Sequence, residues 1–166
     1  MRLHLQKLIH TPGESLPFDF TLDLSEVDVG GENPVCEPVL VSGVVKNTAG
    51  MLSLEAEASS QLSRCCDRCG KRFRKGQETH IHFLLSQELQ DEDSDDILLL
   101  EGDELDVSEL AYTAFILGMD TKNLCSEDCK GLCSGCGADL NEGLCRCKAE
   151  VDPRWAALAQ FLDKTE

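Results

Sequence analysis

The sequence predicts an α+β fold, in which an antiparallel β-sheet meander with a covering helix is followed by a cysteine-rich module and a terminal helix. Three observations predict it: apolar and polar residues alternate through much of the first half, helical spacing follows Asp106, and eight of the ten cysteines form two clusters. A chain of 166 residues is long enough for one ordinary domain and a small appendage. We expect a sheet domain over residues 1–120 and a cysteine-rich module with a docking helix over residues 121–166.

Alternation with a period of two indicates half-buried strands. Apolar residues occupy every second position from Leu52 to Ala58 and again from Ile81 to Leu85. Turn-forming residues at 47–50 join the first of these strands to the apolar run 40–45. We therefore expect a meander, with residues 66–69 at the tip of a long hairpin.

Two segments have the caps and spacing of helices. Asp106 fits an N-cap with Glu109 three residues later, and an apolar stripe follows until Gly118, which predicts a helix that covers one face of the sheet. Asp152 and Pro153 fit the start of a second helix, whose apolar stripe predicts docking.

The charge is large and unevenly placed. The formal net charge is −16, and no Lys or Arg occurs from residue 76 to 121. Residues 88–109 hold eleven carboxylates and should form a solvated acidic loop, interrupted by the aliphatic run 97–100, which is short enough to be a strand or a docking segment. Such a surface favours a basic partner. The run is far shorter than the roughly 18 residues of a membrane span, and the amino terminus is too polar for a secretory signal, so we expect a cytoplasmic protein with no membrane partner.

Cysteine spacing is the strongest signal for chemistry. In a reducing compartment, clustered cysteines indicate metal sites or catalytic thiols rather than disulfides. A Cys-x2-Cys pair followed by a Cys-x-Cys pair can supply four thiolates to one tetrahedral Zn²⁺ ion. The chain is too short here for a core of its own, so zinc would supply folding free energy. The four ligands expected for this site are Cys133, Cys136, Cys145 and Cys147.

A second zinc site is expected to join the hairpin tip to the segment before that cluster. Cys66 and Cys69 form a Cys-x2-Cys pair that needs two more ligands, and Cys125 and Cys129 are the unclaimed pair. Three alternatives stay open: Cys65 in place of Cys66, His80 or His82 in place of a cysteine, and Cys129 exchanged with Cys133. Cys36 has no partner in the pattern, and we expect an inert or surface thiol.

A basic segment surrounds the mid-chain pair. Six of the fifteen Lys and Arg residues fall between residues 64 and 75. They could simply neutralise a thiolate-rich site and solvate an exposed turn. The functional hypothesis is that the tip contacts structured RNA through phosphates rather than base edges. The candidates are Arg64, Arg68, Lys71, Arg72, Arg74 and Lys75.

An enzyme is the competing class. Redox Cys-x2-Cys pairs occur singly at helix amino termini, and catalytic zinc needs an open coordination position. Here eight thiolates would fill two closed sites, so we expect no enzymatic activity, no catalytic residue and no small-molecule substrate. The alternatives are a dithiol oxidoreductase or zinc hydrolase acting on RNA, and a zinc adaptor protein without RNA contact.

Three segments resemble the YceD family of bacterial proteins, and together with the strand-rich first half they extend the resemblance over nearly the whole chain. The segments are CDRCGKRF (66–73), LCSEDCKGLCSGCGADLNEGLCRC (124–147) and DPRWAAL (152–158). The long cysteine run and the Asp-Pro-Arg-Trp after it are specific, whereas the mid-chain pair alone would be weak. The resemblance implies a factor for 23S rRNA accumulation and large ribosomal subunit assembly. Its partners would be precursor 23S rRNA, a pre-ribosomal particle or a basic large-subunit ribosomal protein.

Overall fold

The computed structural model describes residues 1–87, 97–100, 102–143 and 145–147, which form two compact units. Unit 1 comprises Met1–Arg64 and Phe73–Thr121, and unit 2 comprises Cys65–Arg72 and the described residues from Lys122 on. Residues 65–72, which we expected to belong to the sheet domain, thus group with the cysteine-rich segment, and the division into domains stays a prediction. The expected terminal helix and residues 88–96 of the expected acidic loop lie outside the described residues.

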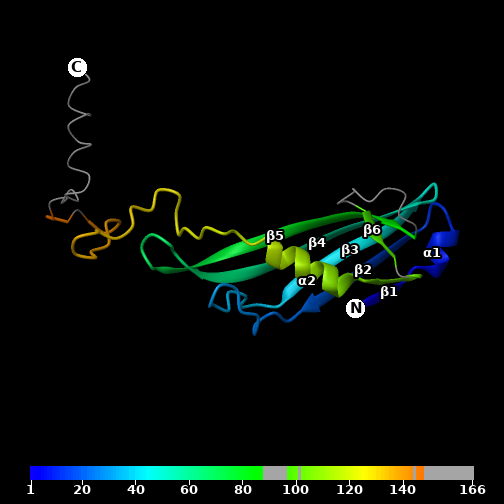
Figure 1. Ribbon diagram of the computed structural model, residues 1–166, viewed down its shortest axis with the longest axis horizontal. Coiled ribbons are helices and arrows are strands. Elements are labelled where there is room, and N and C mark those ends of the chain that lie inside the picture. Colours follow the sequence, from blue (N-terminus) through cyan, green and yellow to red (C-terminus); the bar gives the residue numbers. More distant parts are fainter. Residues whose placement is uncertain (88–96, 101, 144, 148–166) are drawn as a thin grey trace, which may run out of the picture. The chain divides into compact units, whose positions relative to one another are not determined.

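A five-stranded sheet in the order β2-β3-β4-β5-β6 dominates unit 1 (Figure 1). β2 pairs with β3 and β3 with β4 in antiparallel register, whereas β6 runs parallel to β5. The sheet-rich first half is therefore confirmed, and the aliphatic run after residue 96 forms a strand. The strands are β2 (Ser15–Leu22), β3 (Val39–Thr48), β4 (Met51–Cys65), β5 (Arg72–Ser86) and β6 (Ile97–Leu99).

The predicted alternation matches the burial along β4 and β5. Leu52, Leu54 and Ala58 are buried on β4, and Ile81 and Leu85 are buried on β5. Side chains two residues apart share one face of a strand, so these five residues contribute to one core. Each large aliphatic side chain buried in this way stabilises the fold by about 1.5–3 kcal/mol.

A two-residue turn joins β3 to β4. Ala49 and Gly50 both have positive φ values, +54° and +93°, as a type I′ hairpin turn requires. Buried Asn47 supports this turn by accepting a hydrogen bond from the Gly50 N–H at 2.9 Å. Its amide also donates to the Leu8 carbonyl at 2.6 Å, which fixes the short helix α1 (Gln6–His10) against the turn.

Helix α2 (Val107–Leu117) lies where the caps predict it. The Asp106 carboxylate accepts hydrogen bonds from the backbone N–H groups of Ser108 and Glu109, and Gly118 is the C-cap. Val107, Ala111 and Phe115 are buried in the same core as the strands. A small second sheet pairs β1 (Arg2–His4) with β7 (Glu104–Asp106) directly before α2. In the part of the chain that the structure describes, no helix is long and apolar enough to cross a membrane.

Candidate metal centres

Two turns of unit 2 have the sequence Cys-x2-Cys-Gly and the same backbone hydrogen bonds. In the first, the Cys66 N–H donates to the Lys71 carbonyl at 2.9 Å, and the Gly70 N–H donates to the Cys66 carbonyl at 2.8 Å. Gly70 has φ +70°, which favours glycine because a Cβ would be strained there. The second turn repeats both bonds at 2.8 Å, from Cys133 to Ala138 and from Gly137 (φ +72°) to Cys133.

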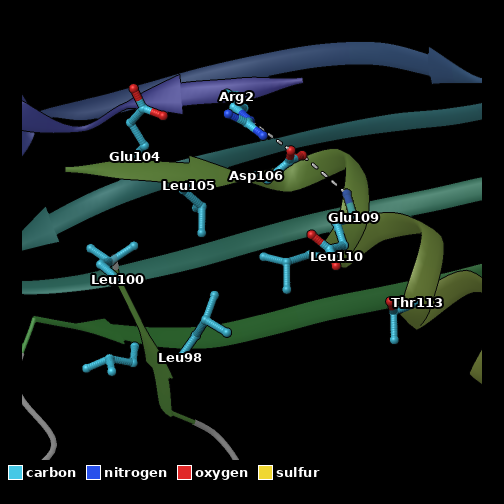
Figure 2. A pocket seen from close by; sticks show the side chains of 10 residues that line it. Arg2, Leu98, Leu100, Glu104, Leu105, Asp106, Glu109, Leu110 and Thr113 are labelled. Carbon is cyan, nitrogen blue, oxygen red and sulfur yellow. Dashed lines mark hydrogen bonds and ion pairs between the residues drawn. The ribbon is translucent and has the colours of Figure 1, made fainter. Parts of the chain in front are cut away.

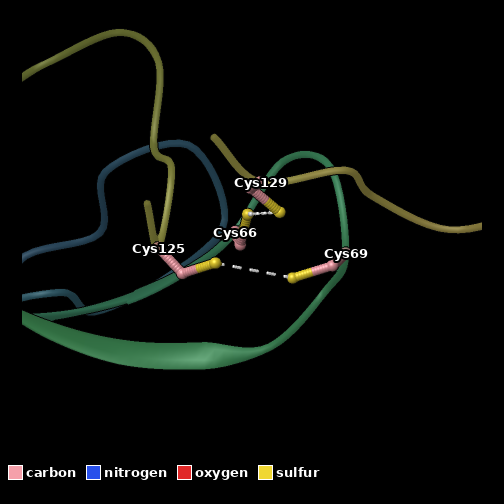
Figure 3. A group of neighbouring side chains, drawn as sticks. All are labelled: Cys66, Cys69, Cys125 and Cys129. Carbon is pink, nitrogen blue, oxygen red and sulfur yellow. Dashed lines mark hydrogen bonds between the residues drawn. The ribbon is translucent and has the colours of Figure 1, made fainter. Parts of the chain in front are cut away.

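The first cluster consists of Cys66, Cys69, Cys125 and Cys129, whose sulfur atoms all lie within 4.8 Å of one another. Figure 3 shows the four side chains converging. Cys66 Sγ lies 3.8 Å from Cys129 Sγ, and Cys69 Sγ lies 3.7 Å from Cys125 Sγ. Thiolates about 2.3 Å from a tetrahedral Zn²⁺ ion lie about 3.8 Å apart. These two sulfur separations thus fit a four-thiolate metal site.

The second cluster consists of Cys133, Cys136, Cys145 and Cys147, and its sulfur atoms also lie within 4.8 Å of one another. Cys145 Sγ lies 3.2 Å from Cys133 Sγ. Cys136 and Cys147 are exposed, whereas Cys66 and Cys129 of the first cluster are buried. The described residues thus contain two four-cysteine clusters that could hold metal ions, and the second is more open to solvent.

Ionisation differs among the thiols of the first cluster. A hydrogen bond from the Cys125 backbone N–H, together with those from Cys69 and Arg68, lowers the pKa of Cys66 to about 6. Burial, followed by the neighbouring thiols, raises the pKa of Cys125 to about 12. One thiolate therefore forms readily, whereas four at this spacing need a cation to offset their charge.

The second cluster has the same asymmetry. The Cys145 thiol, followed by the Gly135 backbone N–H, lowers the pKa of Cys133 to about 6 by hydrogen bonding. The Cys136 side chain, followed by that of Cys133, raises the pKa of Cys147 to about 12. Deprotonation of all four thiols is again coupled to the presence of a positive ion.

Arg68 connects the first turn to residues 127–132, which precede the second turn, through both its side chain and its backbone carbonyl. Its guanidinium donates to the Cys129 carbonyl at 2.7 Å and to the Glu127 carbonyl at 3.2 Å. The Arg68 carbonyl accepts from the Leu132 N–H at 3.1 Å. Gly131 allows this approach, because a Cβ at that position would lie 3.0 Å from the Arg68 carbonyl oxygen and its φ is +74°.

Asn141 is a site residue that the sequence did not reveal. It lies in the loop between the cysteine pairs of the second cluster, where we interpreted it only as a turn residue. Its amide nitrogen donates to Cys129 Sγ of the first cluster at 3.4 Å, and its carbonyl oxygen accepts from the Lys130 N–H at 2.8 Å. The only signal in the sequence for this contact is that Asn141 is a polar residue between cysteines with metal-ligand spacing. Many solvent-facing residues in such loops are also polar, so the signal does not single out Asn141.

The structure separates the alternative ligands from the clusters. Cys66, not Cys65, lies among the four sulfurs of the first cluster, and Cys129 lies in the first cluster while Cys133 lies in the second. His80 lies instead near two exposed carboxylates, 4.0 Å from Glu57 and 3.4 Å from Glu78. Which of these residues bind metal stays a prediction.

Several of the predicted RNA-contact residues have partners within the protein. Arg64 is only 6% exposed, and its guanidinium donates to Met119 Sδ at 3.0 Å. Arg74 lies 3.6 Å from a Glu37 carboxylate oxygen, and Lys75 is paired with Asp120.

Lys71 and Arg72 have exposed side chains in unit 2, next to the first cysteine turn. The Lys71 carbonyl closes the turn by accepting from the Cys66 N–H, and Arg72 follows it directly in the chain. Of the six candidates, these two are the most directly available to an external anion, and RNA contact by any of them stays a prediction.

Comparisons with known proteins find relatives of this chain, one of which is named for ribosomal RNA. A maize protein named large ribosomal RNA subunit accumulation protein YCED homolog 1, chloroplastic, is 25% identical over 179 residues, which cover 89% of this chain and 61% of that protein. An uncharacterized protein of Mycobacterium tuberculosis is 24% identical over 165 residues, which cover 95% of this chain and 73% of that protein. The chain thus spans less than two thirds of the maize relative. No solved structure shows a significant match.

The family model described as large ribosomal RNA subunit accumulation protein YceD matches residues 54–162. This range includes both cysteine clusters, the basic segment from residue 64 to 75 and helix α2, and it is well over half of the 166 residues. The chain therefore belongs to the YceD family.

Proposed function

We propose that this chain is a non-enzymatic cytoplasmic factor for 23S rRNA accumulation and large ribosomal subunit assembly. The family description supports the process, and the maize relative has the same process in its name. We further propose that it binds precursor 23S rRNA or a pre-ribosomal particle, together with a basic large-subunit ribosomal protein.

We propose that each cysteine cluster binds one Zn²⁺ ion as a structural site. The main support is the lack of an apolar core in the described part of unit 2, where the buried apolar residues are Cys66 and Cys129. The 21 residues of the main hydrophobic cluster all belong to unit 1. A small unit without a core needs another source of folding free energy, and four-thiolate zinc sites supply it.

We propose that Lys71 and Arg72 contact RNA phosphates. Both are exposed, and the adjacent metal site would hold their backbone in a fixed turn. Phosphate contacts position a protein on RNA without reading its sequence, which suits a factor that recognises folded precursor RNA.

Charge reversal tests this contact. The double variant Lys71→Glu/Arg72→Glu should bind precursor 23S rRNA more weakly, and the slope of log affinity against log salt should fall by about one per lost phosphate contact. The matched control, Lys7→Glu/Lys122→Glu, makes the same charge change at exposed positions outside the basic segment. Equal crosslinking to RNA by wild type and both variants would rule out the basic segment as the contact.

The process itself is tested in cells that lack the protein. Their ratio of mature 23S to 16S rRNA should fall, and wild-type protein should restore it. An unchanged ratio would overturn the assembly role. Rescue by a variant that no longer crosslinks to RNA would instead favour an adaptor that acts through protein contacts alone.

A further inference from the structure

A groove of about 510 Å³ in unit 1 lies between β6, β7 and α2 (Figure 2). Figure 2 shows Leu98 of β6, Leu105 of β7 and Leu110 of α2 gathered around this space, together with Leu100, which follows β6. Leu100 and Leu105 are buried, whereas the neighbouring Leu99, which also lines the groove, is 46% exposed. A single exposed leucine is ordinary, but leucines from three elements around one hollow form an apolar surface that a ligand can cover.

The rim of the groove is acidic. Three carboxylates line it, from Glu104, Asp106 and Glu109, against the single guanidinium of Arg2. Arg2 Nε donates to Asp106 at 3.2 Å, and the amino-terminal ammonium lies 3.7 Å from the same carboxylate, so these cations are engaged with Asp106. Glu104 has a half-exposed side chain 3.3 Å from His4, and Glu109 is exposed. The groove therefore combines an apolar floor with the exposed carboxylates of Glu104 and Glu109 on its rim.

We propose that this groove binds a basic peptide segment in which an apolar side chain is flanked by lysine or arginine. The apolar side chain would lie on the leucines, and the flanking cations would face Glu104 and Glu109. The inference deepens the proposed function, because it gives the expected basic ribosomal protein a docking site on the chain.

Charge complementarity selects this occupant over a second copy of the chain. The formal net charge is −16, and residues 76–121, which supply most of the lining, contain no Lys or Arg. Two copies that met at this groove would bring two acidic rims together, which costs free energy, whereas a cationic segment gains on approach.

Peptide binding to the zinc-loaded full-length chain tests the proposal. The probe is a fluorescently labelled peptide of seven alternating lysine and leucine residues. Two control peptides replace all lysines by glutamate or all leucines by serine. The probe should bind measurably, and each control peptide should bind at least about tenfold more weakly, a ratio that binding titrations resolve readily.

Variants assign the binding to the groove. Glu104→Gln/Glu109→Gln and, separately, Leu99→Ser should each weaken probe binding by about tenfold. The matched controls are Glu14→Gln/Glu26→Gln, at exposed carboxylates elsewhere, and Leu40→Ser, at a leucine that is 59% exposed on β3. They should bind the probe as wild type does. Circular dichroism confirms that each variant is folded.

Three results would overturn the proposal: no probe binding by wild type, equal loss in groove and control variants, or a concentration-dependent dimer that Leu99→Ser abolishes. The last result would assign the groove to a second copy. None of these results depends on the 23S to 16S rRNA ratio in cells that lack the protein. The proposed docking site can therefore be disproved while the proposed assembly role stands, and the reverse.

Discussion

At the scale of single residues, Asn141 couples the two cysteine clusters. It lies between the cysteine pairs of the second cluster, yet its amide donates to Cys129 Sγ in the first. N–H groups that donate to thiolate ligands orient them and tune their basicity, and loss of such an outer partner typically reduces metal affinity by 10–100-fold. Folding of the second cluster would thus help to order the first.

We predict that Asn141→Ala weakens metal binding at the first cluster by roughly tenfold or more, because Cys129 loses its N–H donor. Asn141→Asp keeps an acceptor for the Lys130 N–H but has no donor for the sulfur, nor for Asp139 Oδ1, to which the Asn141 amide also donates at 2.6 Å. Chelator competition measures the affinity, and Glu142→Ala at the exposed neighbour is the control. Wild-type affinity in Asn141→Asp would contradict a role for the N–H to sulfur contact.

The basic segment shows the limit of sequence reasoning at this scale. Six Lys and Arg residues look equivalent in the chain, but Arg64 is buried and its Nε has no hydrogen-bond partner within the described residues. Arg68 donates to two backbone carbonyls, whereas Lys71 is exposed. Composition locates a cluster of charge, but tertiary packing decides which side chains face water.

At the scale of elements, Gly43 permits close packing in the sheet. It pairs with Phe18 on β2 and with Ala56 on β4. A Cβ at position 43 would lie 2.5 Å from the Ala56 Cβ and 2.7 Å from the Phe18 ring. Both distances are shorter than side chains tolerate, so strands β2 to β4 can keep this arrangement only with glycine there.

We predict that Gly43→Ala lowers the free energy of unfolding of unit 1 by about 1–3 kcal/mol, the usual cost of overpacking. Gly76→Ala on β5 is the matched control, because the added Cβ would meet only Gln61 Nε2 at 3.5 Å. The control should be neutral or slightly stabilising, since glycine weakens a strand. Urea denaturation followed by circular dichroism measures both, and equal stability of the two variants would refute the packing argument.

We predict that Asp106→Ala destabilises α2 by about 1 kcal/mol, because two backbone N–H groups of the first turn lose their acceptor. The Ser108 hydroxyl, and then Arg2, also hold the pKa of Asp106 below its usual range, which is consistent with a stabilised carboxylate. The control is Asp103→Ala in the preceding turn, and thermal unfolding measures the difference. Identical melting temperatures in the two variants would show that the cap contributes nothing.

Sequence patterns located the elements with strong local signals. Alternation predicted the buried faces of β4 and β5, and the Asp106 cap and Gly118 predicted both ends of α2. The parallel pairing of β6 with β5 and the pairing of β1 with β7 join residues far apart in the chain. No local periodicity encodes such pairings, so the small second sheet and the leucine groove beside it emerged only from the structure.

At the scale of the whole molecule, the two units differ in what stabilises them. Unit 1 has a continuous apolar core, and the described part of unit 2 has eight clustered cysteines in its place. Metal-ligand spacing predicted which cysteines gather, but the distribution of four sulfurs to each cluster depends on how residues 65–72 meet the segment after residue 121. That contact is non-local, which is why the exchange of Cys129 and Cys133 stayed open in the sequence.

We predict that a strong zinc chelator unfolds unit 2 and leaves the sheet of unit 1 folded, because the proposed zinc sites would be the principal stabilising contacts of unit 2. Hydrogen exchange of the backbone amides measures this directly. Amides of the two cysteine turns, such as those of Gly70 and Gly137, should lose protection, whereas those within β3 and β4 should keep it. Unchanged protection throughout unit 2 would show that metal is not required for its structure.

Native mass spectrometry of freshly purified protein is the most direct test of the two structural zinc sites. The mass should exceed that of the polypeptide by two zinc ions, and Cys69→Ser and Cys136→Ser should each retain one, whereas Cys36→Ser, outside both clusters, should retain two. A metal-free wild-type protein, or two bound ions in Cys69→Ser and Cys136→Ser alike, would contradict the account.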